Sequence, residues 1–471
     1  MLQTFKNAWK VPELKSKILF TLMILLLYRI GANLYVPFVN VSAIQSTDIT
    51  QGALEFLSLI SGGALSQATF FALSVSPYIT ASIVIQLLTV AIPALERLSK
   101  QGEEGKKKLT KYTRILTVAL SLVTAFGYVK LLEANELLTV KLFEDMEQFE
   151  QAEFLAKGLN VAANDFMYYF AHFVMIACFC AGASIIMWLA EKIDAHGIGN
   201  GISMILFANI IASTTTTIQQ MVYMLKKPLV EGTLDYGFSE AWKTGGALVG
   251  GIVGIVVSIL ITLGAIVLIV WFTNSERRIP IQYAKRVVGR KMYGGQSSNL
   301  PLKMNMAGVM PVIFASSIVS IPATIAGFTG GKFSLWVSKW FGQTSVIFIL
   351  LNIILILLFS YFYIMISFNP IEVSNNIRSQ GGSVPGIRPG KPTSDYIKKI
   401  LNRITLMGAI FLVVVAVVPM IVNAITNLFN YYFASMAFMG TSLLIVVGVA
   451  LETVRDMEAQ MAMRNYKGFL D

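Results

Sequence analysis

One arginine in this chain lies in a setting that suits the recognition of an anion. Arg388 lies between Pro385 and Pro389 in "GGSVPGIRPGKP", residues 381–392. Each proline restricts φ, and the glycines beside them permit turn geometries that are closed to other residues. The guanidinium offers five donors in a planar fork, which fits a carboxylate or a phosphate. The sequence predicts that Arg388 docks onto an anionic partner; the alternative is that it caps a helix or bonds carbonyls of its own loop.

Residues for catalysis or metal binding are scarce. The chain has two histidines, His172 and His196, and neither lies in a repeated metal-ligand spacing. Its two cysteines, Cys178 and Cys180, lie two positions apart, so a helix would point them in different directions. The glycines of "HGIGNGIS" are not followed by the lysine of a phosphate-binding loop, and we interpret them as a tight turn into a helix. We therefore expect no enzyme, no catalytic residue, no metal site and no cofactor.

The composition places most of the chain in lipid. Of its 471 residues 55% are apolar and 13% are charged, which leaves more apolar surface than one soluble core can bury. A helix needs about 20 apolar residues to cross a hydrocarbon layer of roughly 30 Å. Ten such runs predict an all-α polytopic membrane protein with ten transmembrane helices, near residues 18–36, 76–93, 112–132, 166–190, 202–222, 246–272, 306–326, 345–367, 404–426 and 433–451.

Lys and Arg gather in the loops on one side of these helices. Such charges resist crossing the membrane, so both termini are predicted to be cytoplasmic. The long basic loops 273–305 and 368–403 lie on the same side, and loops of that length are commonly functional. This bias explains most of the net charge of +11, although the basic face could also attract anionic lipid, ribosomal RNA or an acidic protein.

Residues 53–73 are apolar enough to suggest an eleventh helix, but the charges argue against a crossing there. An extra crossing before the helix at 76–93 would move the basic loop 94–111 to the outer side. Gly62 and Gly63 also interrupt the segment. We interpret it as a re-entrant half-helix, and irregular backbone at membrane depth requires protein or a watery cavity around it.

The helix after this segment carries a stripe that changes from aliphatic to polar. Val75, Ile79, Ser82 and Gln86 recur at spacings of four, three and four, so they share one face. The polar pair either bonds neighbouring helices or lines a cavity. Ionisable groups are otherwise almost missing from the predicted spans, which disfavours an ion-coupled transporter of small solutes. Arg29 is the exception, and it either reaches toward the outer interface or pairs inside the bundle.

Several motifs in the chain resemble the SecY family, the central subunits of bacterial protein-conducting channels. In the family's order they are "SGGALSQATFFALSVSPYITASIVIQLLTV", "GIGNGIS", "RRIPIQYAKR", "QSSNLPLKMNMAGVMPVIFASSI", "VPGIRPG" and "GTSLLIVV". The resemblance implies two five-helix halves in inverted pseudo-symmetry, residues 18–222 and 246–451. An external connector at 223–245 would join them, and residues 1–17 and 452–471 would form the cytoplasmic ends.

The resemblance also implies the roles of individual residues. The re-entrant segment, about 55–73, would be a plug with Ser61, Gly62 and Gly63 near its tip. A ring of aliphatic side chains would close the pore: Val75, Ile79, Ile202, Leu206, Ile313 and Ile445. A lateral gate would contain Ser82, Gln86, Asn305, Ser316 and Ser317. A motor ATPase or a ribosome would dock at Arg290, Lys291 and Arg388.

The function implied by the resemblance is a passive channel of the bacterial plasma membrane. It would carry unfolded secretory polypeptides across and release transmembrane segments sideways into lipid. The expected partners are the small subunits SecE and SecG, the motor SecA, the ribosome, signal sequences with their nascent chains, and anionic lipid, with no nucleic-acid substrate. The alternative is a small-solute secondary transporter; an intramembrane hydrolase lacks a credible nucleophile and base.

Overall fold

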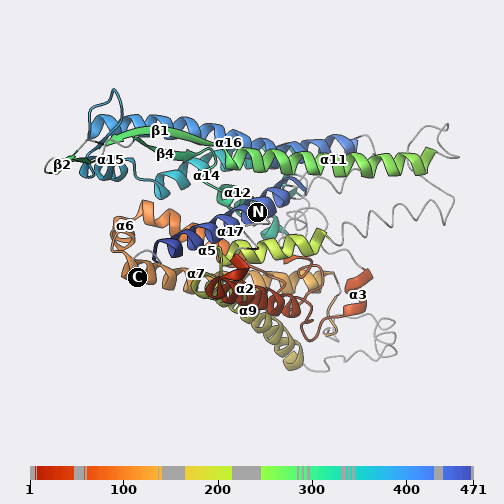
Figure 1. Cartoon of the computed structure of the whole chain (residues 1–471). Helices are drawn as coiled ribbons and strands as arrows, with labels where there is room; N and C mark the ends of the chain where they lie inside the picture. Colours follow the sequence, from red (N-terminus) through yellow and green to blue (C-terminus); the bar gives the residue numbers. More distant parts are fainter. Residues whose placement is uncertain are drawn as a thin grey trace. The chain divides into compact units, whose positions relative to one another are not determined.

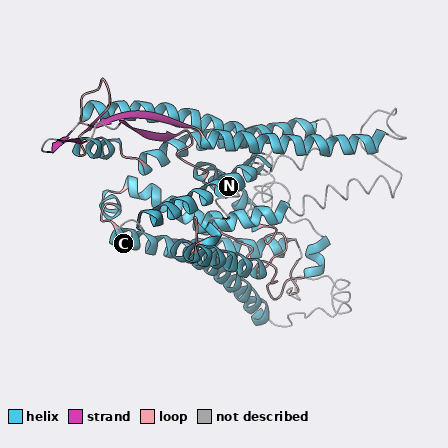
Figure 2. Ribbon diagram, viewed as in Figure 1, coloured by secondary structure: helices cyan, strands magenta, loops and turns pink. Residues whose placement is uncertain are grey.

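The chain is mainly helical, as Figures 1 and 2 show. The computed structural model describes residues 6, 8–46, 58, 61–135, 137–140, 165–214, 246–283, 286–288, 291–293, 297–329, 336–337, 340–341, 345–428 and 439–467. The chain divides into two compact units. Unit 1 comprises Met1–Leu234, Ser316–Phe348 and Val449–Asp471, and unit 2 comprises Asp235–Ala315 and Ile349–Gly448.

Unit 1 is built around a group of contacting helices. Helices α5, α7 and α9 contact one another, α2 contacts α9, and α6 contacts both α5 and α7. The helices are α2 (Pro12–Gly31), α3 (Val41–Ser46), α5 (Ser76–Ala91), α6 (Pro93–Ser99), α7 (Glu103–Ala134), α9 (Asp165–His196) and an unlabelled helix at Gly201–Thr214.

Prolines set several of the helix boundaries. Pro12, Pro77 and Pro93 lie in the first turns of α2, α5 and α6, where a missing backbone donor costs nothing. Ile92 precedes Pro93 and is extended, with φ −109° and ψ 113°, because a residue before proline avoids the helical region. Helix α6 therefore turns by 107° from the direction of α5.

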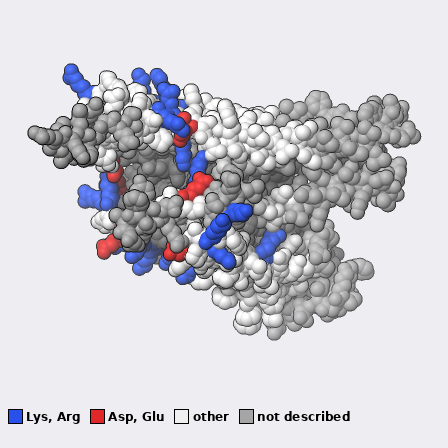
Figure 3. Space-filling model, viewed as in Figure 1, with Lys and Arg blue, Asp and Glu red and all other residues white. Residues whose placement is uncertain are grey.

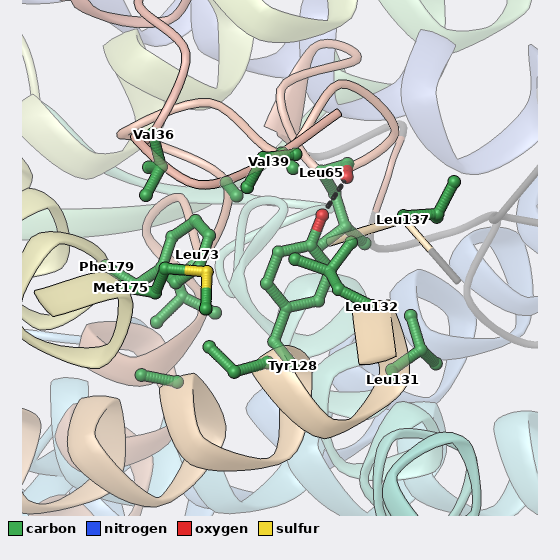
Figure 4. Packing of buried hydrophobic residues seen from close by; sticks show 14 of the residues in the cluster. Val36, Val39, Leu65, Leu73, Tyr128, Leu131, Leu132, Leu137, Met175 and Phe179 are labelled. Carbon is green, nitrogen blue, oxygen red and sulfur yellow. Dashed lines mark hydrogen bonds between the residues drawn. The ribbon is translucent and has the colours of Figure 1, made fainter. Parts of the chain in front are cut away.

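The core of unit 1 joins helices to irregular chain. Buried residues of α7 and α9 pack against the segments 36–39 and 65–73, as Figure 4 shows. The rings of Tyr128 and Phe179 meet edge to face with centroids 5.1 Å apart. A Cβ on Gly182 of α9 would lie 2.0 Å from the carbonyl oxygen of Phe70, so only glycine allows this approach. Lipid is as apolar as a leucine side chain, and such close packing is therefore what associates helices in a membrane.

Unit 2 combines long helices with a small sheet. Its helices include α11 (Gly246–Asn274), α15 (Pro370–Ser379) and α16 (Lys391–Leu428); α12 (Met310–Thr329), α14 (Val346–Ser367) and α17 (Met439–Lys467) contain the boundary between the units. In the sheet, β1 (Glu276–Tyr283) pairs antiparallel with β4 (Ser297–Lys303) and with β5 (Gly382–Ser383). A separate pair joins β2 (Arg286–Val288) to β3 (Lys291–Tyr293).

The expectation of an all-α protein is wrong for these loops. The stretch "ERRIPIQY" alternates, so that Ile279 and Ile281 are buried while Pro280 between them is exposed. Both isoleucines belong to apolar clusters with residues of α15 or α16. The sheet thus fixes the basic loop 273–305 to the loop 368–403 within unit 2.

Each of the ten apolar ranges predicted as spans overlaps a helix. Among the described residues, four helices are long and apolar enough to cross a membrane, or five if α5 and α6 count as one bent span. Residues 61–75 are different, because they run through turns and one isolated bridge rather than a long helix. The count of ten crossings stays a prediction. So does the part of the re-entrant half-helix, predicted over 53–73, that precedes residue 61, since most residues there lie outside the described ones.

Gly182 gives a direct test of this packing. We expect Gly182→Ala to lower the free energy of unfolding by about 1–3 kcal/mol, because the new methyl group meets the Phe70 carbonyl. Gly264→Ala in α11 is the matched control, since its Cβ would meet nothing within 4 Å and alanine favours a helix by up to about 1 kcal/mol. Thermal unfolding in lipid nanodiscs checks both; equal stability of the two variants would contradict the close contact.

Candidate functional site

The segment 61–75 is tied to the chain that follows α2. Tyr35 and Thr69 form an antiparallel bridge, and the Phe70 amide donates to the Leu34 carbonyl at 2.7 Å. The Tyr128 hydroxyl donates to the carbonyl of Leu65, which Figure 4 marks with a dashed line. The segment therefore lies against the residues that follow α2 and against α7, and its backbone makes hydrogen bonds to both.

The first turn of this segment depends on left-handed glycines. Gly62 and Gly63 have φ of +65° and +85°, values that other residues rarely adopt. The Ser61 hydroxyl accepts from the Leu65 amide at 3.0 Å and closes the turn. Arg29 donates to the Gly62 carbonyl at 3.4 Å, so the charged exception in the first predicted span contacts this segment. The sequence alone does not decide between this contact and a position of Arg29 at the outer interface.

A buried polar cluster lies where the segment ends. The Asn209 amide nitrogen donates to the Tyr28 hydroxyl at 2.8 Å and to the Ser74 hydroxyl at 3.4 Å. All three residues are at most 2% exposed. We call them the Asn209 cluster. No sequence pattern indicates this cluster, because Tyr28 and Asn209 lie 181 positions apart in regions with the composition of ordinary apolar spans.

The glycine motif at 197–201 forms the turn that the sequence predicted. Gly199 has φ of +77°, and a Cβ on Gly201 would lie 2.0 Å from the Ala190 carbonyl oxygen. Two side chains cap the following helix: Asp194 accepts from the Gly201 amide at 2.7 Å, and Asn200 accepts from the Ser203 amide at 3.2 Å. This turn positions the helix that carries Ile202 and Leu206.

The six predicted ring residues are divided between the units. Val75, Ile79, Ile202 and Leu206 belong to unit 1, and Ile313 and Ile445 belong to unit 2. All are buried except Ile202, which is half-buried. Within unit 2, a Cβ on Gly448 would lie 2.3 Å from Val309 Cγ1, so α17 approaches the start of α12 one turn from each ring residue. The ring itself stays a prediction.

The predicted gate residues are also divided. Ser82, Gln86, Ser316 and Ser317 belong to unit 1 and Asn305 to unit 2. Gln86 donates to the Ser82 hydroxyl at 3.4 Å, so the polar end of the α5 stripe is bonded along its own helix. The others are buried. Whether they line one seam stays a prediction.

The loop that carries Arg388 has a fixed shape. Gly386 and Gly390 have φ of +80° and +100°, as a proline–glycine turn requires. Thr393 donates to the Arg388 carbonyl at 2.9 Å, and Ser374 of α15 donates to the Gly390 carbonyl at 2.8 Å. Val384 anchors the other end in an apolar cluster with residues of β1, β4 and α16. We call residues 384–391 the tether.

The tether presents Arg388 outward. The side chain is exposed, and it makes no hydrogen bond or ion pair with any other residue in the described part of the chain. Within the described residues, the guanidinium of Arg388 therefore bonds no carbonyl of its own loop. In unit 2 the charged side chains gather at the end with β1, β4 and α15, away from the uncharged described stretch of α11 (Figure 3). Arg290 lies outside the described residues, as does the Lys291 side chain.

A metal site has little support among the described residues. These contain no group of three or more His, Cys, Asp or Glu residues that could hold a metal. His172 does have a carboxylate in space, since its Nε2 lies 3.6 Å from Glu133 Oε2. Lys130 occupies the same carboxylate oxygen at 2.7 Å, which leaves the pair as a structural contact rather than a cation site.

A SecY family model matches residues 69–454 of the chain. The chain belongs to the SecY family. The protein translocase subunit SecY of Streptomyces scabiei is 40% identical over 477 residues, covering 100% of both chains. SecY proteins are subunits of a protein-conducting membrane channel and are not enzymes, which confirms the prediction that the chain is not an enzyme.

Two solved structures share the fold of this SecY-family chain. One is a SecY structure described as showing that the plug domain stabilises the closed state of the translocation channel and maintains a membrane seal. Its TM-score is 0.54 at 18% identity, with 96% coverage of both chains. The other is Sec61 in the canine ribosome–channel complex of the endoplasmic reticulum, with a TM-score of 0.51 at 17% identity and 96% coverage of both chains.

The tether's shape can be tested without any partner. Thr393→Val keeps the side-chain volume but removes the hydrogen bond to Arg388, so we expect amides of residues 386–391 to exchange about five- to tenfold faster. Thr405→Val is the control, because its hydroxyl bonds only the Leu401 carbonyl of its own helix. Hydrogen exchange followed by mass spectrometry measures both; identical tether protection in the two variants would refute a tether fixed by Thr393.

Proposed function

We propose that this chain is the passive polypeptide channel of a bacterial plasma membrane, with both termini cytoplasmic. It would move unfolded secretory polypeptides across the membrane and release transmembrane segments sideways into lipid. The observation that carries the proposal is the segment 61–75, an irregular stretch enclosed by helices of a SecY-family chain. Such backbone is tolerated at membrane depth only against protein or a watery cavity.

In this proposal the re-entrant segment, about 55–73, with Ser61, Gly62 and Gly63 near its tip, is the plug. The ring Val75, Ile79, Ile202, Leu206, Ile313 and Ile445 forms an apolar constriction, which resists wetting and closes around a chain in transit. The seam containing Ser82, Gln86, Asn305, Ser316 and Ser317 parts to admit signal sequences. The halves 18–222 and 246–451 move relative to each other as this seam opens.

The energy for transport comes from a partner rather than from the chain. The proposed partners are SecE and SecG as small subunits and SecA or a ribosome as the driving machine; a related channel has been solved on a ribosome. The tether supports this role, because an exposed arginine on a fixed turn loses little conformational entropy when it docks. Arg290, Lys291 and Arg388 would contact acidic or phosphate groups of that partner, and anionic lipid would surround the basic face.

Import of a preprotein into vesicles tests the proposal. Vesicles carrying the wild-type chain with SecE, SecG and SecA should protect the preprotein from added protease. Arg388→Glu should reduce uptake by about tenfold or more while assembly stays intact, because it places a like charge at the contact, and Arg388→Lys should recover only part of it.

Lys398→Glu provides the matched control for that experiment. Lys398 is an exposed cation on α16 in the same unit, so its reversal changes the net charge equally without touching the tether. We expect uptake near the wild-type level. Equal losses in the two variants would remove the docking role, and a wild-type complex that protects no preprotein would overturn the function itself.

A further inference from the structure

Both ends of the segment 61–75 meet at Asn209. A Cβ on Gly62 would lie 3.1 Å from both Asn209 Cα and Asn209 Oδ1, so the first turn of the segment rests directly on this residue. At the other end, Ser74 lies 3.4 Å from the Asn209 amide nitrogen. One side chain in the helix Gly201–Thr214 thus contacts the segment where it begins and where it ends.

The turn at Ser74 is held in an unfavourable backbone conformation. Ser74 has φ of +51°, a left-handed value that residues with a Cβ rarely adopt. Such a conformation persists only where the surroundings determine it, and it is common at points that switch between two arrangements. Ser74 immediately precedes Val75 and α5. A change in the backbone conformation of Ser74 alone would therefore redirect the segment relative to that helix.

Tyr28 connects the same contacts to α2. Its hydroxyl accepts from Asn209, and its ring stacks on Phe71 of the segment with centroids 5.4 Å apart and planes 11° apart. A buried amide or hydroxyl that loses its partner pays its full desolvation cost, so the members of the Asn209 cluster depend on one another. The cluster is complete only while the segment lies where the structure has it.

We propose that the Asn209 cluster is a latch that sets how often the channel is open at rest. Asn209 and Tyr28 are positioning residues: they keep the segment 61–75 in place, and an arriving polypeptide opens the channel by separating Ser74 and Gly62 from them. The latch rests on the proposed plug function, and it assigns the stability of the closed state to three side chains of this chain.

Conductance of the resting complex tests the latch. Tyr28→Phe keeps the ring and its stack on Phe71 but removes the oxygen that accepts from Asn209, and Asn209→Leu keeps the volume but removes the donor. Loss of the bond between Tyr28 and Asn209 should raise the resting open probability about tenfold in planar bilayers that contain the complete complex. Asn209→Leu also loses the bond to Ser74 and should leak at least as much. Thr117→Val on α7, whose buried hydroxyl bonds its own helix, is the control for removing one hydroxyl and should not leak.

A double variant separates a latch from a general loss of stability. If Tyr28 and Asn209 act through their shared bond, the leak of Tyr28→Phe/Asn209→Leu falls well short of the product of the two single leaks. Independent destabilisation would instead multiply the two leaks. Preprotein uptake, measured on the same vesicles, should remain at or above the wild-type level in every variant, because an easier opening does not hinder transport.

The glycine pair supplies a second comparison that needs no change in the cluster. Alanine at Gly62 and at Gly63 meets a similar left-handed backbone, but only the Gly62 methyl group would press on Asn209; at Gly63 the nearest atom is Ser66 Oγ at 3.9 Å. Gly62→Ala should therefore leak several-fold more than Gly63→Ala. The latch would be overturned if Tyr28→Phe had wild-type conductance and the two glycine variants leaked equally. Normal preprotein uptake in the same samples would leave the channel function standing. A wild-type complex without uptake would overturn the function instead.

Discussion

Backbone amides and carbonyls within a membrane must find partners inside the protein, and a segment without a long helix, such as 61–75, must find many of them in its neighbours. An unsatisfied backbone group in hydrocarbon costs several kcal/mol. The segment has no long helix to satisfy its own groups. It bonds instead to the Leu34 carbonyl, to Tyr128 and to its own turns. The protein surface that this bonding requires is provided by helices α2, α7 and α9 and by the helix Gly201–Thr214.

Close approach to this segment explains why small residues occur where they do. Gly31 faces the Phe71 ring, Gly182 faces the Phe70 carbonyl, and Gly62 faces Asn209. Each contact is shorter than a Cβ would permit without a shift of its neighbour. The segment is consequently fitted to one position, and a channel that must open needs a second arrangement in which these contacts are given up together. Two left-handed residues of the segment, Ala68 and Ser74, have backbone conformations that such a change could relax.

The sequence predicted the features that depend on local pattern. Apolar runs gave the ten helical ranges, and "GIGNGIS" gave a turn that the structure confirms, because glycine spacing and an asparagine cap act over a few residues. The strands at 276–283 and 297–303 were missed, since a short alternation inside a basic loop is a weak signal beside long apolar runs. Tyr28, Ser74 and Asn209 were missed because their bonds join distant parts of the chain. The ring and the gate rest on the resemblance alone, as their residues come from both units.

Site-specific photo-crosslinking tests whether a polypeptide passes through the proposed aliphatic ring. A preprotein arrested halfway by a folded domain at its end would be irradiated in complexes that carry a photoreactive residue at Ile79 or Ile202. The control position is Leu263, a 54% exposed residue of α11. We expect cross-links from the arrested chain to Ile79 and Ile202 and none to Leu263. Cross-links at Leu263 without any at the two isoleucines would contradict this expectation.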